Sequence, residues 1–136
     1  MIDVLLVPER TVVTANGDSE PLDLSGAETR IFLLTLTITS VVEQESIEVS
    51  VFTSEDGNKW ESKPITALPQ KFYVGEHPLL VDLTAVPNAK FLRAHWEVSR
   101  WGRGPTTPQF VISVRTREVS REMLQEAAER TAAGSR

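Results

Sequence analysis

Two segments near the middle of the chain alternate apolar and polar residues. Segment 30–40 places apolar side chains at every second position, at Phe32, Leu34, Leu36 and Ile38. Segment 45–54 does the same with Ile47, Val49 and Val51. Successive side chains of a strand point to opposite faces, so each segment predicts a strand with one buried face. Because only a few residues separate the two segments, we expect adjacent antiparallel strands at the centre of one sheet.

The same alternation predicts strands at 91–101 and 110–116. The apolar face of the first holds Leu92, Ala94, Trp96 and Val98, and that of the second holds Phe110, Ile112 and Val114. Shorter extended segments, bounded by proline, glycine or polar residues, are predicted at 2–7, 10–15, 21–24, 65–68, 71–74 and 79–83. Pro8 is expected to end the first of these, so that 2–7 and 10–15 form separate strands.

Two dipeptides predict sharp turns. Asn16-Gly17 follows segment 10–15, and Asp56-Gly57 follows segment 45–54. Residues of these types tolerate the positive φ of a tight hairpin turn. At the second turn we expect a hairpin whose return strand begins at Trp60.

Only the tail changes to a helical period. Between Ser120 and about residue 133 the chain is rich in helix formers, and a narrow apolar stripe is formed by Met123, Leu124, Ala127 and Ala128. Ser120 is a suitable N-cap, and Gly134 suits the end of the helix. Because so short a helix is marginal alone, the pattern predicts that it packs on its own subunit or on a neighbouring one.

Together these patterns predict an all-β fold. Short strands punctuated by turns are typical of an antiparallel β-sandwich, and we expect a jelly-roll-like one of about eight strands. It would span residues 1–117, followed by a short C-terminal α-helix in a tail of residues 118–136.

The composition of the chain argues against some classes of function. The chain has 136 residues, no cysteine and a formal net charge of −5. This balance argues against nucleic-acid binding, which needs a basic face, and no apolar run is long enough to cross a membrane. The first residues lack the pattern of a secretory signal, so we expect a protein made in the cytoplasm.

The residues that could carry chemistry have simpler explanations. His77, expected in a loop, and His95, expected on the polar face of a strand, lack the neighbours that a metal or catalytic site needs. Glu55 and Asp56 could ligate calcium, but they lie in the turn that Gly57 already predicts. We therefore expect no enzyme, no cofactor and no metal.

Aromatic residues near strand ends are the better candidates for binding. Trp60, Tyr73 and Trp101 could stack on sugar rings, and Trp101 with Arg103 could anchor a protein interface. The alternative for Trp60 and Trp101 is a place in the core, where Trp96 is also expected. The polar strand faces carry Arg93, Arg115 and Arg117, which in an assembly could meet an acidic neighbour.

Two resemblances follow from the segment Val49-Ser50-Val51-Phe52-Thr53-Ser54-Glu55-Asp56-Gly57-Asn58-Lys59-Trp60 and the later Lys90-Phe91-Leu92-Arg93-Ala94. Over 49–98 the chain resembles discoidin-like carbohydrate-binding domains, without their cysteine pair. Over 21–117, with the lead Leu22-Asp23-Leu24-Ser25-Gly26-Ala27, it is similar to small structural proteins of tailed bacteriophages and prophages.

The phage resemblance is the broader one. It implies a non-enzymatic virion protein, a capsid decoration or tail component that assembles in the host cytoplasm. Such a protein binds other copies of itself, for example as a trimer, and a capsid or tail protein. The candidate contact residues are Trp101, Arg103, Trp60, Tyr73, Met123 and Leu124. The discoidin resemblance implies the alternative, a carbohydrate-binding module that uses exposed aromatic residues.

Overall fold

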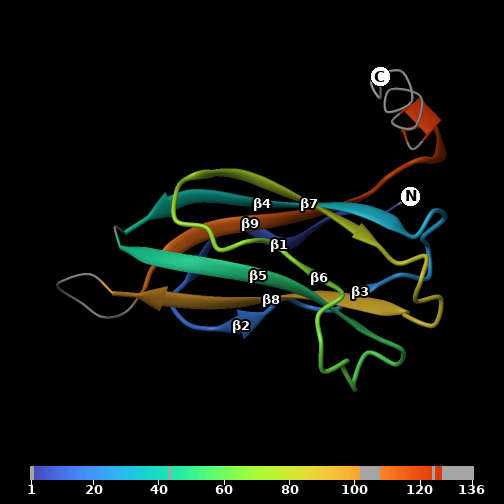
Figure 1. Ribbon diagram of the computed structural model, residues 1–136, viewed down its shortest axis with the longest axis horizontal. Helices are drawn as coiled ribbons and strands as arrows, with labels where there is room; N and C mark the ends of the chain where they lie inside the picture. Colours follow the sequence, from blue (N-terminus) through green and yellow to red (C-terminus); the bar gives the residue numbers. More distant parts are fainter. Residues whose placement is uncertain (1, 43, 102–107, 124, 127–136) are drawn as a thin grey trace, which may run out of the picture.

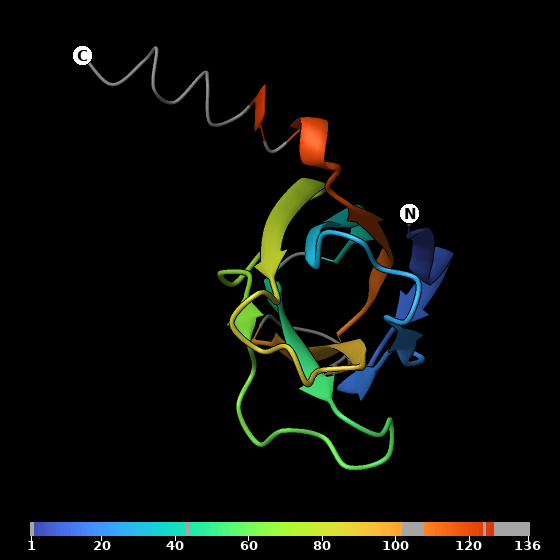
Figure 2. The same cartoon turned by 90° about the vertical axis from the view of Figure 1, so that its right-hand side faces the viewer.

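The computed structural model describes residues 2–42, 44–101, 108–123, 125 and 126. These residues form nine strands in two sheets, and every strand pairing is antiparallel. The two sheets form the layers of a sandwich (Figures 1 and 2). The predicted all-β antiparallel sandwich is therefore confirmed.

The strand order places the two strongest predicted strands in the interior of their sheets. The four-stranded sheet has the order β1 (Asp3–Val13), β9 (Phe110–Glu118), β4 (Ile31–Val41) and β7 (Gly75–Asp82). The five-stranded sheet has the order β2 (Gly17–Asp18), β8 (Phe91–Arg100), β5 (Glu45–Ser54) and β6 (Thr66–Ala67), with β3 (Leu22–Asp23) also paired to β8.

The core lies between the sheets and consists of the predicted alternating residues. Those of β4 and β5 are at most 1% exposed: Phe32, Leu34, Leu36, Ile38, Ile47, Val49 and Val51. Phe110, Ile112 and Val114 of β9 are fully buried, as are Leu92 and Ala94 of β8. Burial of this apolar area between the sheets is the main force holding the layers together.

One central expectation is wrong: β4 and β5 are not paired. β4 pairs with β7 and β9, whereas β5 pairs with β6 and β8 in the other sheet. Gln44 takes a positive φ of 62°, and the buried carboxylate of Glu45 accepts hydrogen bonds from the N–H groups of Val42 (2.9 Å) and Gln109 (2.7 Å). These contacts fix a crossover between the layers, which the alternation of residues cannot reveal.

The N-terminal part also differs from the expectation. Segments 2–7 and 10–15 belong to a single strand, β1, whose pairing with β9 shifts register between Leu5 and Val7 and between Val7 and Thr11. Arg10, with a φ of 63°, lies in this irregular part. Pro8 is tolerated because β1 is an edge strand, where a missing N–H group breaks no ladder.

The first predicted glycine turn crosses between the sheets, and the second lies in an irregular hairpin between β5 and β6. Asn16-Gly17 carries the chain from one sheet to the other, and the Asn16 side chain accepts a hydrogen bond from the N–H of Val98. Trp60 makes only an isolated bridge with Ser54, and the return strand is the short β6. Segment 71–74 is likewise limited to one bridge, between Lys71 and Ile47.

His77 lies in β7 and is half-buried, so its expected place in a loop is wrong. β7 begins at Gly75, before the predicted segment 79–83, and continues through Pro78. It can do so because β7 is the other edge of its sheet.

The first described residue, Ile2, meets the end of β9 at Glu118. Its buried carboxylate accepts hydrogen bonds from the N–H groups of Ile2 (3.1 Å), Glu28 (2.7 Å) and Thr29 (2.7 Å). Burial by itself raises the pKa of this carboxyl, but the hydrogen bonds outweigh it and lower the pKa below the ordinary value. β9 thus extends one residue past the predicted domain boundary.

After β9 the chain turns into the predicted helix. Residues 121–123, 125 and 126 are helical, and the Ser120 hydroxyl accepts a hydrogen bond from the N–H of Met123 at 3.1 Å, as an N-cap does. The rest of the predicted helix lies outside the described residues. Within the part of the chain that is described, no helix has the length and apolar character needed to cross a membrane.

Candidate binding surfaces

Three aromatic side chains lie together at one end of the sandwich. Phe72, Tyr73 and Trp101 are 38%, 78% and 58% exposed. The ring of Phe72 lies between the other two, with centroids 6.2 Å from Tyr73 and 5.9 Å from Trp101. We call these three residues the aromatic patch.

The backbone on both sides holds the patch in place. Lys71 exchanges two backbone hydrogen bonds with Ile47 at the start of β5, at 3.0 and 2.9 Å. The N–H of Trp101 donates to the carbonyl of Gln44 at 3.0 Å. The patch therefore sits where the chain crosses between the sheets, and in Figure 1 this is the left end of the molecule, where β7 begins.

The polar groups of the patch form no hydrogen bonds with the described residues. Neither the Tyr73 hydroxyl nor the Trp101 indole N–H forms a hydrogen bond with any of the described residues. Exposed Val74 directly follows Tyr73 in the chain. Rings with an apolar body and a free donor are typical of protein interfaces and of ligand platforms.

Sequence analysis singled out Tyr73 and Trp101 but not Phe72. Segment 71–74 was expected to be a strand, in which alternate residues would be buried. Instead Phe72, Tyr73 and Val74 are all exposed. Three consecutive large apolar residues beside Lys71 were the available signal for an irregular, exposed segment.

Trp60 lies elsewhere, on the outer face of the five-stranded sheet. The guanidinium of Arg93 stacks over its ring, 4.3 Å from the centroid. Asp18 contacts both Arg93, at 3.6 Å, and His95 Nδ1, at 2.8 Å. The ring of Phe52 meets His95 edge-on at 5.7 Å. With Glu61 these residues line a depression of about 200 Å³, the Trp60 cluster.

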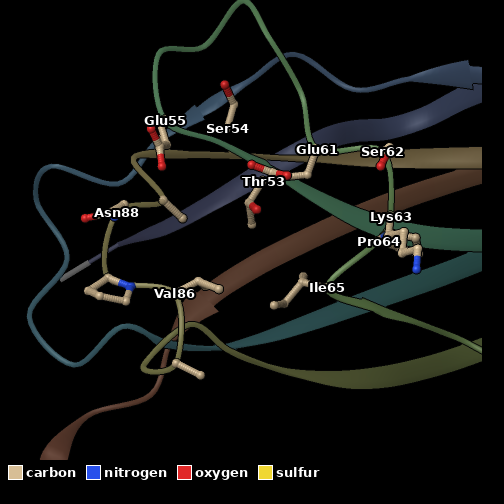
Figure 3. A pocket seen from close by; sticks show the side chains of 13 residues that line it. Thr53, Ser54, Glu55, Glu61, Ser62, Lys63, Pro64, Ile65, Val86 and Asn88 are labelled. Atoms are coloured by element: carbon tan, nitrogen blue, oxygen red, sulfur yellow. The ribbon is translucent and has the colours of Figure 1, made fainter.

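A cleft opens at the end opposite the aromatic patch. It has a volume of about 440 Å³ and lies between segments 61–65 and 85–89. Figure 3 shows Ile65 and Val86 directed toward one another, with Glu55 on one side and Glu61 and Lys63 on the other. The cleft thus has apolar walls and a charged rim.

Both walls of the cleft are anchored. The N–H groups of Glu61 and Ile65 donate to the carbonyls of Thr53 (3.1 Å) and Val51 (2.8 Å). The other wall is held by Arg30, whose Nη2 donates to the carbonyls of Val86 and Ala89, each at 2.9 Å. The cleft is therefore a built feature of the fold.

The loop between β5 and Trp60 is a turn, as the sequence indicated. Asp56 accepts hydrogen bonds from the N–H groups of Asn58 and Lys59, both at 2.8 Å, and from the Ser54 hydroxyl at 3.1 Å. The Lys59 and Asn58 N–H groups lower the pKa of Asp56. Across the described residues, no group of three or more histidine or acidic side chains could hold a metal ion.

The remaining predicted residues lie apart. Met123 is 41% exposed in the first turn of the helix, whereas Arg103 and Leu124 lie outside the described residues. Trp96 is half-buried and packs against the core, as expected. Arg115 meets an acidic group of its own chain, donating from Nε and Nη2 to Asp3 at 2.9 and 2.7 Å.

The chain was compared with protein-family models and with curated proteins. No protein-family model matches the chain, and no curated protein matches it.

Proposed function

We propose that this chain is a non-enzymatic structural protein of a phage-like particle, a capsid decoration or tail component. It would act by self-association and by binding to the particle lattice. The observation that carries the proposal is the aromatic patch: Phe72, Tyr73 and Trp101 present adjoining rings to solvent at one end of a well-packed sandwich. Tyr and Trp are enriched among the residues that dominate binding energy.

The fold supports this role through its stiffness. The patch is fixed to β5 by the backbone hydrogen bonds between Lys71 and Ile47, and to the connection between β4 and β5 by the bond from Trp101 to Gln44. A rigid anchor loses little conformational entropy on binding. Repeated over many copies, even a modest contact gains from avidity.

Purified particles from the source cells provide the test. We expect the chain in particles banded on a density gradient, at fixed stoichiometry by mass spectrometry. Replacing Tyr73 and Trp101 by serine should lower its amount in particles at least tenfold while its amount in the cell is unchanged. Val12→Ser, at an exposed position on β1, the edge strand opposite β7, should not. Banded particles from wild-type cells that lack the chain would refute the proposal.

Carbohydrate binding is the second candidate, favoured by the Trp60 cluster. Asp18 and Glu61 supply acceptors, Arg93 and His95 supply donors, and Trp60 supplies an aromatic surface. Such a mixed set suits sugar hydroxyls, which both donate and accept.

A glycan array would test this candidate. We expect saturable binding that Asp18→Asn and Trp60→Ala each abolish, because both the acceptor and the ring are lost from one depression. Tyr73→Ala, outside the cluster, serves as the control and should bind as the wild type does. Failure to bind any glycan, or binding that survives both substitutions, would rule the cluster out as the site.

A further inference from the structure

We infer that copies of this chain associate head to tail, the aromatic patch of one copy entering the cleft at the opposite end of the next. The inference rests on the self-association in the proposed function and names the two surfaces that would meet. One is the protruding patch of Phe72, Tyr73 and Trp101. The other is the cleft between segments 61–65 and 85–89.

The two surfaces cannot meet within one copy. The patch is tied to the start of β5 through Ile47, whereas the cleft is built on the end of the same strand, through Thr53. At about 3.3 Å per residue, the six residue steps from Ile47 to Thr53 separate the two anchoring points by about 20 Å. In Figure 1 the connection entering β7 and the loops after β5 and β7 lie at opposite ends.

The chemistry of the two surfaces is complementary. The cleft offers apolar side chains, Ile65 and Val86, beneath the carboxylates of Glu55 and Glu61. These carboxylates have no hydrogen-bond or ion-pair partner among the described residues. An aromatic ring that carries a hydrogen-bond donor fits this cleft, because the ring covers the apolar walls while the donor reaches a carboxylate.

The patch supplies such rings, and a positive charge lies beside it that matches the acidic rim of the cleft. Within the described ranges, neither the Tyr73 hydroxyl nor the Trp101 indole N–H has a hydrogen-bond acceptor, and an exposed carboxylate would supply one. Lys71 stands beside the patch, facing a rim in which Glu55 and Glu61 outnumber Lys63. Opposite charges favour the approach of one copy to the next.

A contact between two different surfaces is heterologous, so each copy keeps one free patch and one free cleft. Repetition of the contact closes a ring if the rotation between copies allows it, and otherwise extends a filament. This separates head-to-tail association from a two-fold dimer, in which both copies use the same surface.

Two variants, each blocked at one end, provide the test. The patch variant carries Tyr73→Ser and Trp101→Ser, and the cleft variant carries Glu55→Lys and Glu61→Lys. Light scattering after size exclusion should give monomers for each variant alone, at concentrations where the wild type forms larger species. An equimolar mixture should give a complex of twice the monomer mass, because the patch variant keeps its cleft and the cleft variant keeps its patch.

The controls are Val12→Ser and Glu48→Lys, which introduce the same replacement residues at other exposed positions and should associate as the wild type does. Circular dichroism checks the fold of each variant, and Glu61→Lys alone replaces the cleft variant if the double substitution unfolds. A monomeric wild type, or a mixture that remains monomeric, overturns the inference. Particles that lack the chain would count against the proposed function and leave this result unchanged.

Discussion

The carboxylate of Glu118 accepts hydrogen bonds from three backbone N–H groups and from the Thr29 hydroxyl, all within 3.2 Å. Replacing it by glutamine puts an NH₂ group where donors already converge. We expect Glu118→Gln to lower the free energy of unfolding by about 1–3 kcal/mol at neutral pH. Urea denaturation would measure the loss, with exposed Glu48→Gln as a control expected to change little.

The same residue predicts a pH dependence with a definite sign. The pKa of Glu118 is lower in the folded protein than its ordinary value of 4.5. Its stabilising contribution is therefore complete above that value and is lost as the pH falls through the lower, folded pKa. The gap in stability between wild type and Glu118→Gln should shrink below pH 4.5; a constant gap would contradict this account.

Single residues were also where sequence reasoning reached its limit. Trp101 and Tyr73 could be selected from their type and their place near strand ends, yet nothing in the chain order brings them together. The ring of Phe72 joins them only because the chain crosses between sheets beside it. Arg93 was assigned to a polar strand face, but its stacking on Trp60 depends on the path of the loop after β5.

Among the elements, the loop after β5 depends on Gly57. Gly57 has a φ of +82°, and an added Cβ would lie 3.3 Å from the ring of Phe91. We expect Gly57→Ala to destabilise the protein by about 1–2 kcal/mol, since the left-handed backbone and the close ring both oppose a side chain. Gly26→Ala is the matched control, because a Cβ there meets nothing within 4 Å. Equal unfolding midpoints for the two variants would argue against the predicted strain.

The positions of the strands were easier to predict than the pairing between strands. The alternation in β4, β5, β8 and β9 identified strands and buried faces, because a period of two follows directly from strand geometry. Pairing is different, since it depends on contacts distant in the sequence. The turn at Gln44 and the buried Glu45 direct β5 into the other sheet. A glutamine or a glutamate at these positions does not by itself indicate that the chain changes sheet.

At the scale of the whole molecule, the sandwich architecture could be predicted because the spacing of strands and turns leaves few alternatives. The candidate surfaces could not, since each gathers residues from separate connections. The cleft, for instance, joins Ile65 and Val86, which approach only because Arg30 holds segment 85–89 against the end of the sandwich. Such an arrangement arises from tertiary structure, so no short stretch of the sequence indicates it.

The bonds from Glu118 to Ile2 and to the 28–29 backbone have a practical consequence. β1 begins and β9 ends at the end of the molecule that carries the cleft, away from Trp101. A bulky reporter fused before Ile2 would stand at this end of the molecule, on the edge of the four-stranded sheet opposite β7, and leave the aromatic rings uncovered. Labels for imaging can also be attached through an engineered cysteine on an outer strand, because the chain has no cysteine of its own.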